Sequence, residues 1–103
     1  MAGDLRDVVS VDRVLHEPAR LVLVALLYPV EDADFLVLLR ESGLTRGNLS
    51  SHLAKLEEAG YVAVAKGYRG KVPHTDYRLT GDGRTAFRSY RDQMQRALKK
   101  LPR

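Results

Sequence analysis

The segment GLTRGNLSSHLAKLEEAGYV, residues 43–62, constrains the fold of this chain most strongly. Three leucines follow the spacing i, i+4, i+7 of a single buried stripe on an α-helix: Leu49, Leu53 and Leu56. Gly43 and Gly60 bound this helix, because glycine readily adopts the left-handed conformation in which helices commonly end. No acid occurs before Glu57, so the segment predicts an amphipathic helix with a basic and polar front half.

Two further helices are expected before this one. Pro18 suits the first turn of an apolar helix that runs to about Leu27 and forms the centre of the core. Asp34 is a plausible N-cap for a second helix over residues 35–42, and Thr45 for the third. Two helices joined by a tight turn that contains glycine form a helix-turn-helix, here residues 34–60.

The hydrophobic period changes after Gly60. Val62 and Val64 alternate with small or polar residues, and so do Tyr77 and Leu79, which predicts a β-hairpin over residues 61–79 with a loose, basic tip. Thr80 then begins a last helix, expected over residues 80–101. The fold class is therefore mainly α with a small β-hairpin.

Length and composition restrict the remaining possibilities. The chain has 103 residues, which suits one domain over residues 1–103, with residues 1–10 as a flexible segment or arm. It contains no cysteine, and its longest apolar run has eight residues, too short for a membrane span. We see no secretory signal, so we expect a cytoplasmic protein without a membrane partner.

Charge is distributed unevenly along the chain. Residues 1–34 hold three basic and seven acidic side chains, whereas the rest carries the excess that makes the net charge +4. The basic C-terminal two-thirds of the chain indicates a surface that binds a polyanion, and nucleic acid is favoured over a membrane as that polyanion.

The order helix, helix, helix, hairpin, helix is that of a winged helix. The stretches GLTRGNLSSHLAKLEEAGYV and KGYRGKVPHTDYRLTGDGRTAF resemble the small winged-helix transcriptional regulators of the MarR/ArsR-like kind, over roughly residues 13–98. This resemblance implies a three-helix core, a wing and a C-terminal dimerisation helix. It also implies that double-stranded DNA is the partner and that the chain binds an operator as a homodimer.

Two groups of side chains are the candidates for DNA contact. Arg, Asn and Ser on an exposed helix face can read base edges in the major groove, and basic residues at a hairpin tip can follow the phosphate backbone or enter a minor groove. The recognition-helix candidates are Thr45, Arg46, Gly47, Asn48, Ser50, Ser51, His52 and Lys55. The wing candidates are Lys66, Tyr68, Arg69, Lys71 and His74.

The last helix carries a candidate dimer seam. Its apolar positions step 3-4-3-4, which is typical of a narrow coiled-coil seam, although packing against the first helix of the same chain would use the same pattern. The seam candidates are Phe87, Tyr90, Met94, Ala97 and Leu101.

Nothing in the sequence predicts catalysis, a metal or another cofactor. The three histidines have no close-spaced partner of metal-ligand type, and the Gly-rich stretch KGYRGK does not precede a helix. The leading interpretation is a DNA-binding repressor, and the alternative is a winged helix that contacts another protein. Whether the chain has a small-molecule effector stays open.

Overall fold

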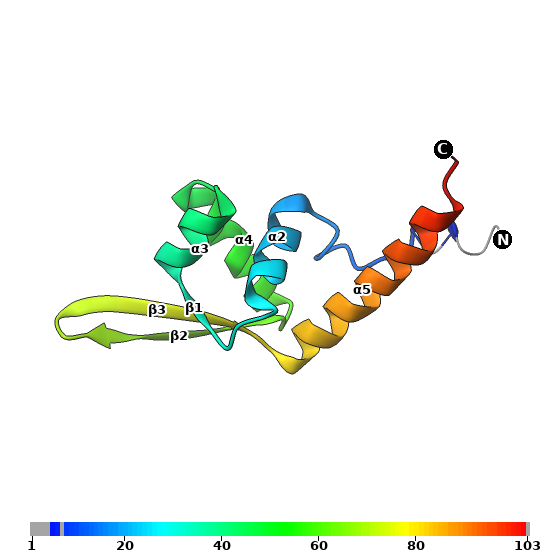
Figure 1. The fold of residues 1–103 in the computed structure, drawn as a ribbon. Coiled ribbons are helices and arrows are strands. Elements are labelled where there is room, and N and C mark those ends of the chain that lie inside the picture. The colour runs from blue at the N-terminus through cyan, green and yellow to red at the C-terminus, as the bar shows by residue number, and fades with distance from the viewer. Residues whose placement is uncertain (1–4, 7, 103) are drawn as a thin grey trace.

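A computed structural model describes residues 5–6 and 8–102. The molecule is elongated, with principal extents of 58 × 25 × 21 Å. Helices α2 (Pro18–Leu27), α3 (Phe35–Ser42) and α4 (Arg46–Glu58) cluster over one part of a small sheet. The hairpin of β2 (Val62–Arg69) and β3 (Val72–Leu79) and helix α5 (Gly81–Lys100) project in opposite directions (Figure 1). The expected flexible segment or arm, residues 1–10, lies partly outside the described residues; of the rest, Val8 and Val9 donate turn hydrogen bonds to the carbonyl oxygens of Leu5 and Arg6.

Helix α2 spans Pro18–Leu27, as the sequence predicts. Glu17 is its N-cap and accepts a hydrogen bond from the Ala19 N–H at 2.5 Å, while Pro18 occupies the first turn, where no N–H is needed. Three side chains of this helix are wholly removed from solvent: Leu23, Val24 and Leu27. Helix α2 is thus the centre of the core and packs against both α3 and α4.

The helix-turn-helix consists of α3, Phe35–Ser42, and α4, Arg46–Glu58. Asp34 caps α3 through the Val37 N–H at 2.8 Å, and Thr45 caps α4 through the Asn48 N–H at 3.2 Å. Gly43 has φ = 70°, the left-handed conformation in which α3 ends. The turn is therefore short and locally determined, and it orients α4 relative to α3.

The sheet has three antiparallel strands in the order β1-β3-β2. Strand β1, Ala33–Asp34, was not expected from the sequence. Strands β2, Val62–Arg69, and β3, Val72–Leu79, form the wing.

The expectation of a loose tip on the wing is wrong. The strands run to a two-residue turn, in which Gly70 has φ = 62°. Glycine at the first central position is typical of a type II′ turn, whose twist suits a regular hairpin. Pro73 is tolerated in β3 because β1 pairs only with Asp76 and Tyr77, so β3 is an edge strand at Pro73.

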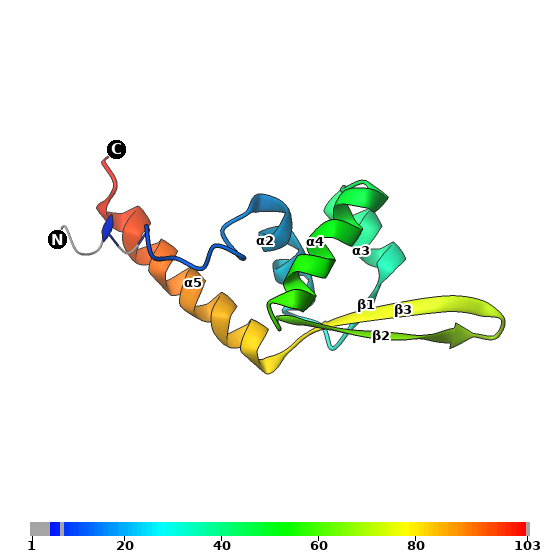
Figure 2. The ribbon, with the colours of Figure 1, turned by 180° about the vertical axis from the view of Figure 1, so that it is seen from behind.

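Helix α5 spans Gly81–Lys100 and leaves the body at an angle (Figures 1 and 2). Thr80 caps it through the Gly83 N–H at 2.9 Å, as its position in the sequence suggests. Residues 8–17 run beside α5 and then turn toward α2 in both views. Among the described residues, no helix is long and apolar enough to cross a membrane.

Candidate nucleic-acid interface

The front of α4 is exposed because its back is anchored in the core. Leu49, Leu53 and Leu56 are at most 2% exposed, which turns the opposite side of the helix to solvent. Seven of the eight recognition-helix candidates are exposed: Thr45, Arg46, Gly47, Asn48, Ser50, Ser51 and Lys55. The leucine spacing alone therefore identified this surface correctly.

The N-terminus of α4 lies on the same surface. Its first turn contains no acidic residue, and the positive end of the helix dipole favours an anion there. Among the described residues outside its own helix turn, no atom lies within 4 Å of the place where a side chain on Gly47 would begin, so this turn is open to a ligand. A phosphate group could therefore approach the first turn closely.

Arg46 is held over an aromatic ring that sequence reasoning missed. Its guanidinium carbon lies 5.9 Å from the centre of the Phe35 ring, and that ring lies 6.4 Å from the ring of Tyr77 on the wing. A cation over an aromatic face is favourable by roughly 0.5–1 kcal/mol at an exposed site. Phe35 thus limits the positions of the Arg46 side chain. No local pattern signals this contact, because Phe35 belongs to another helix.

His52 differs from its neighbours on α4. It is half-buried, and its Nδ1 lies 3.1 Å from Oε2 of Glu17 and 3.2 Å from Nη1 of Arg20. Arg20 in turn donates from Nε to the carbonyl oxygen of Val14 at 2.6 Å. His52 therefore ties the recognition helix to the start of α2, while its exposed neighbours point to solvent.

The wing presents one face to α4. Residues paired across the strands share a face, so Val62, Val64, Lys66 and Tyr68 lie on the same side as their partners on β3. Val64 and Lys66 line a shallow hollow together with Ser50 of α4. Lys66 and Tyr68 therefore lie on the face of the wing that is turned to the recognition helix.

The tip of the wing is exposed and basic. Arg69 and Lys71 flank Gly70 in the turn, and Tyr68 is 74% exposed. His74 lies on the opposite face of the hairpin, where its Nε2 is 2.9 Å from Oδ1 of Asp76. The structure therefore brings four of the five wing candidates to the tip or to the α4 side, although the strand register puts Arg69 on the same face as His74, which lies further from the tip.

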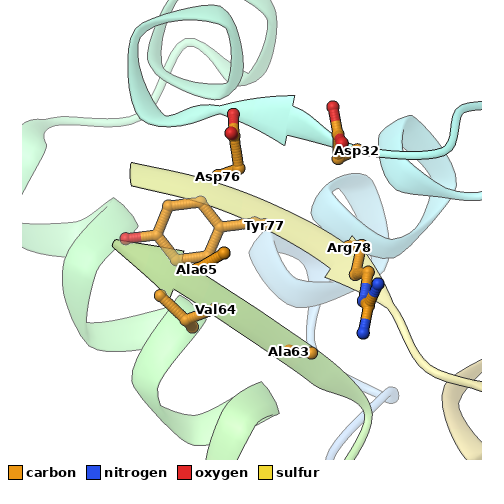
Figure 3. A pocket seen from close by; sticks show the side chains of 7 residues that line it. All are labelled: Asp32, Ala63, Val64, Ala65, Asp76, Tyr77 and Arg78. Atoms are coloured by element: carbon orange, nitrogen blue, oxygen red, sulfur yellow. The ribbon is translucent and has the colours of Figure 1, made fainter. Parts of the chain in front are cut away.

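A second hollow, of about 180 Å³, lies on that opposite face (Figure 3). Asp32, Asp76 and Arg78 line it together with small side chains of β2, so it mixes both signs of charge. Within residues 5–6 and 8–102, no three His, Cys, Asp or Glu side chains are grouped so that they could hold a metal ion.

The seam candidates on α5 divide into two classes. Tyr90 and Ala97 are only 6% and 1% exposed within a single copy, so they have little surface left for a partner. Phe87 and Met94 are half-buried and Leu101 is exposed. Leu98, which sequence reasoning missed, is 59% exposed and lies one turn beyond Met94. Continuing the helical period from Met94 to Leu98 would have found it.

An apolar groove of about 240 Å³ runs between α2 and α5. Its lining includes Leu21 and Ala25 from α2 and, from α5, Phe87, Tyr90, Met94 and Leu98. The exposed apolar surface of α5 is therefore continuous with that of α2.

Comparison with known proteins agrees with this geometry. A family model described as a winged helix DNA-binding domain matches residues 19–98. An uncharacterised protein of Methanocaldococcus jannaschii is 39% identical over 79 residues, which cover 76% of this chain and 85% of the relative.

Solved structures extend the likeness over nearly the whole chain. The transcriptional regulator homologue from Pyrococcus horikoshii OT3 has a TM-score of 0.86 at 26% identity, covering 96% of this chain and 99% of that one. A protein of Halomicrobium mukohataei with a GntR superfamily winged-helix-turn-helix domain has a TM-score of 0.62 at 23% identity, covering 88% and 72%, and supports the fold alone. The resemblance inferred from the sequence is confirmed: the chain belongs to the winged helix DNA-binding family of transcriptional regulators.

Proposed function

We propose that this chain represses transcription as a homodimer that occupies a roughly palindromic operator in double-stranded DNA. The observation that carries the proposal is the joint position of the acid-free front of α4 and the basic wing. Arg46, Asn48 and Ser50 are exposed on α4, and Lys66 lies on the wing face turned toward that helix. One duplex could therefore meet both elements together.

The roles follow from the chemistry of the side chains. Arg46 can place two parallel N–H groups on guanine, and Asn48 can pair with adenine in the major groove. Lys55, Lys66, Arg69 and Lys71 neutralise phosphates, which gives affinity without reading sequence. The open N-terminus of α4 adds a further phosphate contact through its backbone N–H groups.

The proposed dimer uses the apolar surface between α2 and α5. Phe87, Met94 and Leu98 supply the contacts from α5, and Leu21 and Ala25 extend them onto α2. Burial in a second copy would remove this surface from water. A two-fold dimer presents two recognition helices about 34 Å apart, one turn of B-DNA, and therefore prefers a palindromic site.

The proposal includes no catalytic step and assigns no small-molecule effector. Repression needs only that the dimer occupy DNA that polymerase must use, and operator binding places the chain with the genome in the cytoplasm. A partner-protein surface would require apolar anchors on the front of α4, whereas Arg46, Asn48 and Lys55 stand there.

Selection of genomic fragments by the purified protein, followed by sequencing, tests the proposal directly. We expect enrichment of a short sequence with two-fold symmetry. Salt titration on that sequence supplies the second measurement. The logarithm of the binding constant falls linearly with the logarithm of the salt concentration, with a slope of about −0.9 per phosphate neutralised. A dimer that used the four phosphate-binding candidates Lys55, Lys66, Arg69 and Lys71 in each copy would approach a slope of about −7. A flat salt response, or no duplex binding at low salt, contradicts the proposal.

A further inference from the structure

Helix α5 is attached to the body at its base. Arg84 donates from Nη1 to the carbonyl oxygen of Tyr28 at 2.7 Å and from Nη2 to that of Val30 at 3.3 Å. The Tyr28 ring lies under the Arg84 guanidinium and 5.2 Å from the ring of Phe87. These contacts all lie within the first two turns, so by themselves they allow α5 to swing about its base.

A second attachment lies further along α5. The Tyr90 hydroxyl is 2.8 Å from Nδ1 of His16, and Tyr90 is buried beside it. Tyr90 follows Arg84 by six residues, which is about 9 Å along a helix axis. Two points of attachment at this separation restrict the direction of α5, where one point would not.

The residues that reach Tyr90 also reach the recognition helix. Glu17 follows His16 directly and lies 3.1 Å from Nδ1 of His52 on α4. Asp12 accepts a hydrogen bond from the hydroxyl of Tyr61, just beyond the end of α4. Residues 11–17, which we call the brace segment, thus contact α4 through Glu17 and α5 through His16. Figure 2 shows the chain running beside α5 before it enters α2.

The brace segment is itself held firmly. Leu15 is completely buried, and Val11 is 5% exposed. Asp12 Oδ1 accepts from the N–H groups of Val14 and Leu15 at 2.8 and 3.2 Å, and the Val14 carbonyl oxygen accepts from Arg20. Because the brace segment is held rigidly, it couples the orientation of α5 to that of α4.

We propose that the brace segment sets the angle between α4 and α5, and that His16 and Tyr90 are positioning residues for operator recognition. In the dimer this angle fixes the separation of the two recognition helices, and hence the spacing of half-sites that the protein accepts. This consequence rests on the proposed function, whereas the brace itself is a property of one chain.

The first experiment measures the brace without DNA. The chain contains no cysteine, so Ser51→Cys on α4 and Lys99→Cys on α5 introduce two unique sites for spin labels. Labelled chains diluted with unlabelled protein report the distance between α4 and α5 within one copy. We expect Tyr90→Phe, which removes only the hydroxyl, to broaden the distribution of this distance.

Tyr28→Phe is the matched control. It also removes a hydroxyl that contacts α5, since the Tyr28 hydroxyl lies 3.3 Å from Nη1 of Arg88, but it leaves the brace segment intact. We expect its distance distribution to match that of the labelled parent. A Tyr90→Phe distribution as narrow as that of the parent overturns the proposal, and so does equal broadening in Tyr28→Phe.

The second experiment measures half-site spacing. Affinity is determined for a single half-site and for paired half-sites whose spacer is lengthened or shortened by one base pair. We expect Tyr90→Phe to keep its affinity for the single half-site and to lose about two- to tenfold of its preference for the natural spacing, the effect of one hydrogen bond.

A cycle with Glu17→Ala tests whether the two contacts act through one segment. If each contact acted alone, the effects of Tyr90→Phe and Glu17→Ala on the spacing preference would add in the double variant. If both act through the brace segment, we expect the effect of the double variant to differ from the sum of the two single effects. An unchanged spacing preference in Tyr90→Phe overturns the inference while leaving the proposed function in place. If the parent binds no duplex but its distance distribution broadens in Tyr90→Phe, the proposed function fails and the brace stands.

Discussion

The first turn of α5 lies so close to Tyr61 that a methyl group on Gly83 would overlap the Tyr61 carbonyl oxygen. The same carbonyl oxygen accepts a hydrogen bond from the N–H of Thr80 at 3.0 Å. Tyr61 comes three residues after the end of α4, so its backbone links the end of the recognition helix to the start of α5. Glycine at position 83 is required by this contact.

Gly83→Ala should therefore destabilise the fold by about 1–3 kcal/mol, the usual cost of overpacking. The added carbon meets backbone, which cannot rotate away as a side-chain end could. Urea unfolding followed by circular dichroism measures the change.

Gly81→Ala, two residues earlier in the same helix, is the control. In the part of the chain that the structure describes, an added Cβ on Gly81 would meet nothing within 4 Å outside its own helix turn. Alanine there should therefore be neutral or should stabilise α5 by up to about 1 kcal/mol through its helix propensity. Equal effects of the two substitutions would contradict the close approach to Tyr61.

Tyr61 should make stability depend on pH in the alkaline range. Its hydrogen bond to the Asp12 carboxylate, together with burial, raises the pKa of the Tyr61 hydroxyl from 10.0 to about 12. Between these values the unfolded chain releases this proton and the folded chain retains it, so stability falls as pH rises. The contribution is complete below pH 10 and is lost as pH passes through about 12.

The measurement is the urea midpoint of the parent and of Tyr61→Phe at several pH values from 8 upward. The variant lacks only the Tyr61 hydroxyl, and every other ionisable group is present in both proteins. The difference in stability between parent and variant should shrink as pH rises above 10. A constant difference would exclude a proton held between Tyr61 and Asp12.

Arg46 and Lys66 should affect DNA binding in different ways. Arg46→Lys replaces the planar guanidinium, which can donate two parallel hydrogen bonds, by the point charge of an ammonium group. It should therefore reduce the discrimination between bases at one position of each half-site by about 1–3 kcal/mol of binding free energy. Lys66→Ala removes one phosphate contact from each copy of the dimer, so it should weaken binding to all sequences alike and reduce the salt slope by about 2. Competition assays over a panel of single-base operator variants separate these outcomes.

Phe35→Leu provides a check on Arg46 without altering any charge. It keeps an apolar residue at the start of α3 but removes the ring over which Arg46 lies. We expect Phe35→Leu to reduce the discrimination between bases at the same position as Arg46→Lys does, but by a smaller amount. A loss spread evenly over all positions would place Arg46 on the phosphate backbone.

Met94→Glu should convert dimers to monomers. Met94 lines the apolar groove between α2 and α5, and a carboxylate buried there by a second copy would lose its hydration. Sedimentation measures the change. Ser89→Glu places the same charge at an exposed position of the same helix and should leave the dimer intact. Dimers that persist in Met94→Glu would move the interface to another surface.

The helices could be predicted because their signals are local. Pro18 marks the first turn of α2, Asp34 caps α3 and Thr45 caps α4, and each of these signals lies within a few consecutive residues. The leucine stripe of α4 also determined which side chains would face solvent. The exposed part of the candidate interface therefore follows from the sequence almost completely.

The wing tip was misjudged for a reason that is also local. Gly, Pro and basic residues in KGYRGKVPHT are typical of a loop, but Gly70 supplies the one positive φ that a type II′ turn needs. Pro73 then falls where β3 has no second neighbour. Strand β1 was missed because two residues carry no periodicity that could reveal a strand.

The sequence by itself determined the order of the elements, the caps that bound the helices and the polar front of α4, because these depend on side chains a few residues apart. Only the tertiary structure decided that Tyr90 is buried and bonded to His16, that His52 contacts Glu17, and that Arg46 lies over Phe35. Each of these contacts joins residues at least 11 positions apart in the chain. Helical spacing states which residues share a face, but what covers that face depends on how whole elements pack.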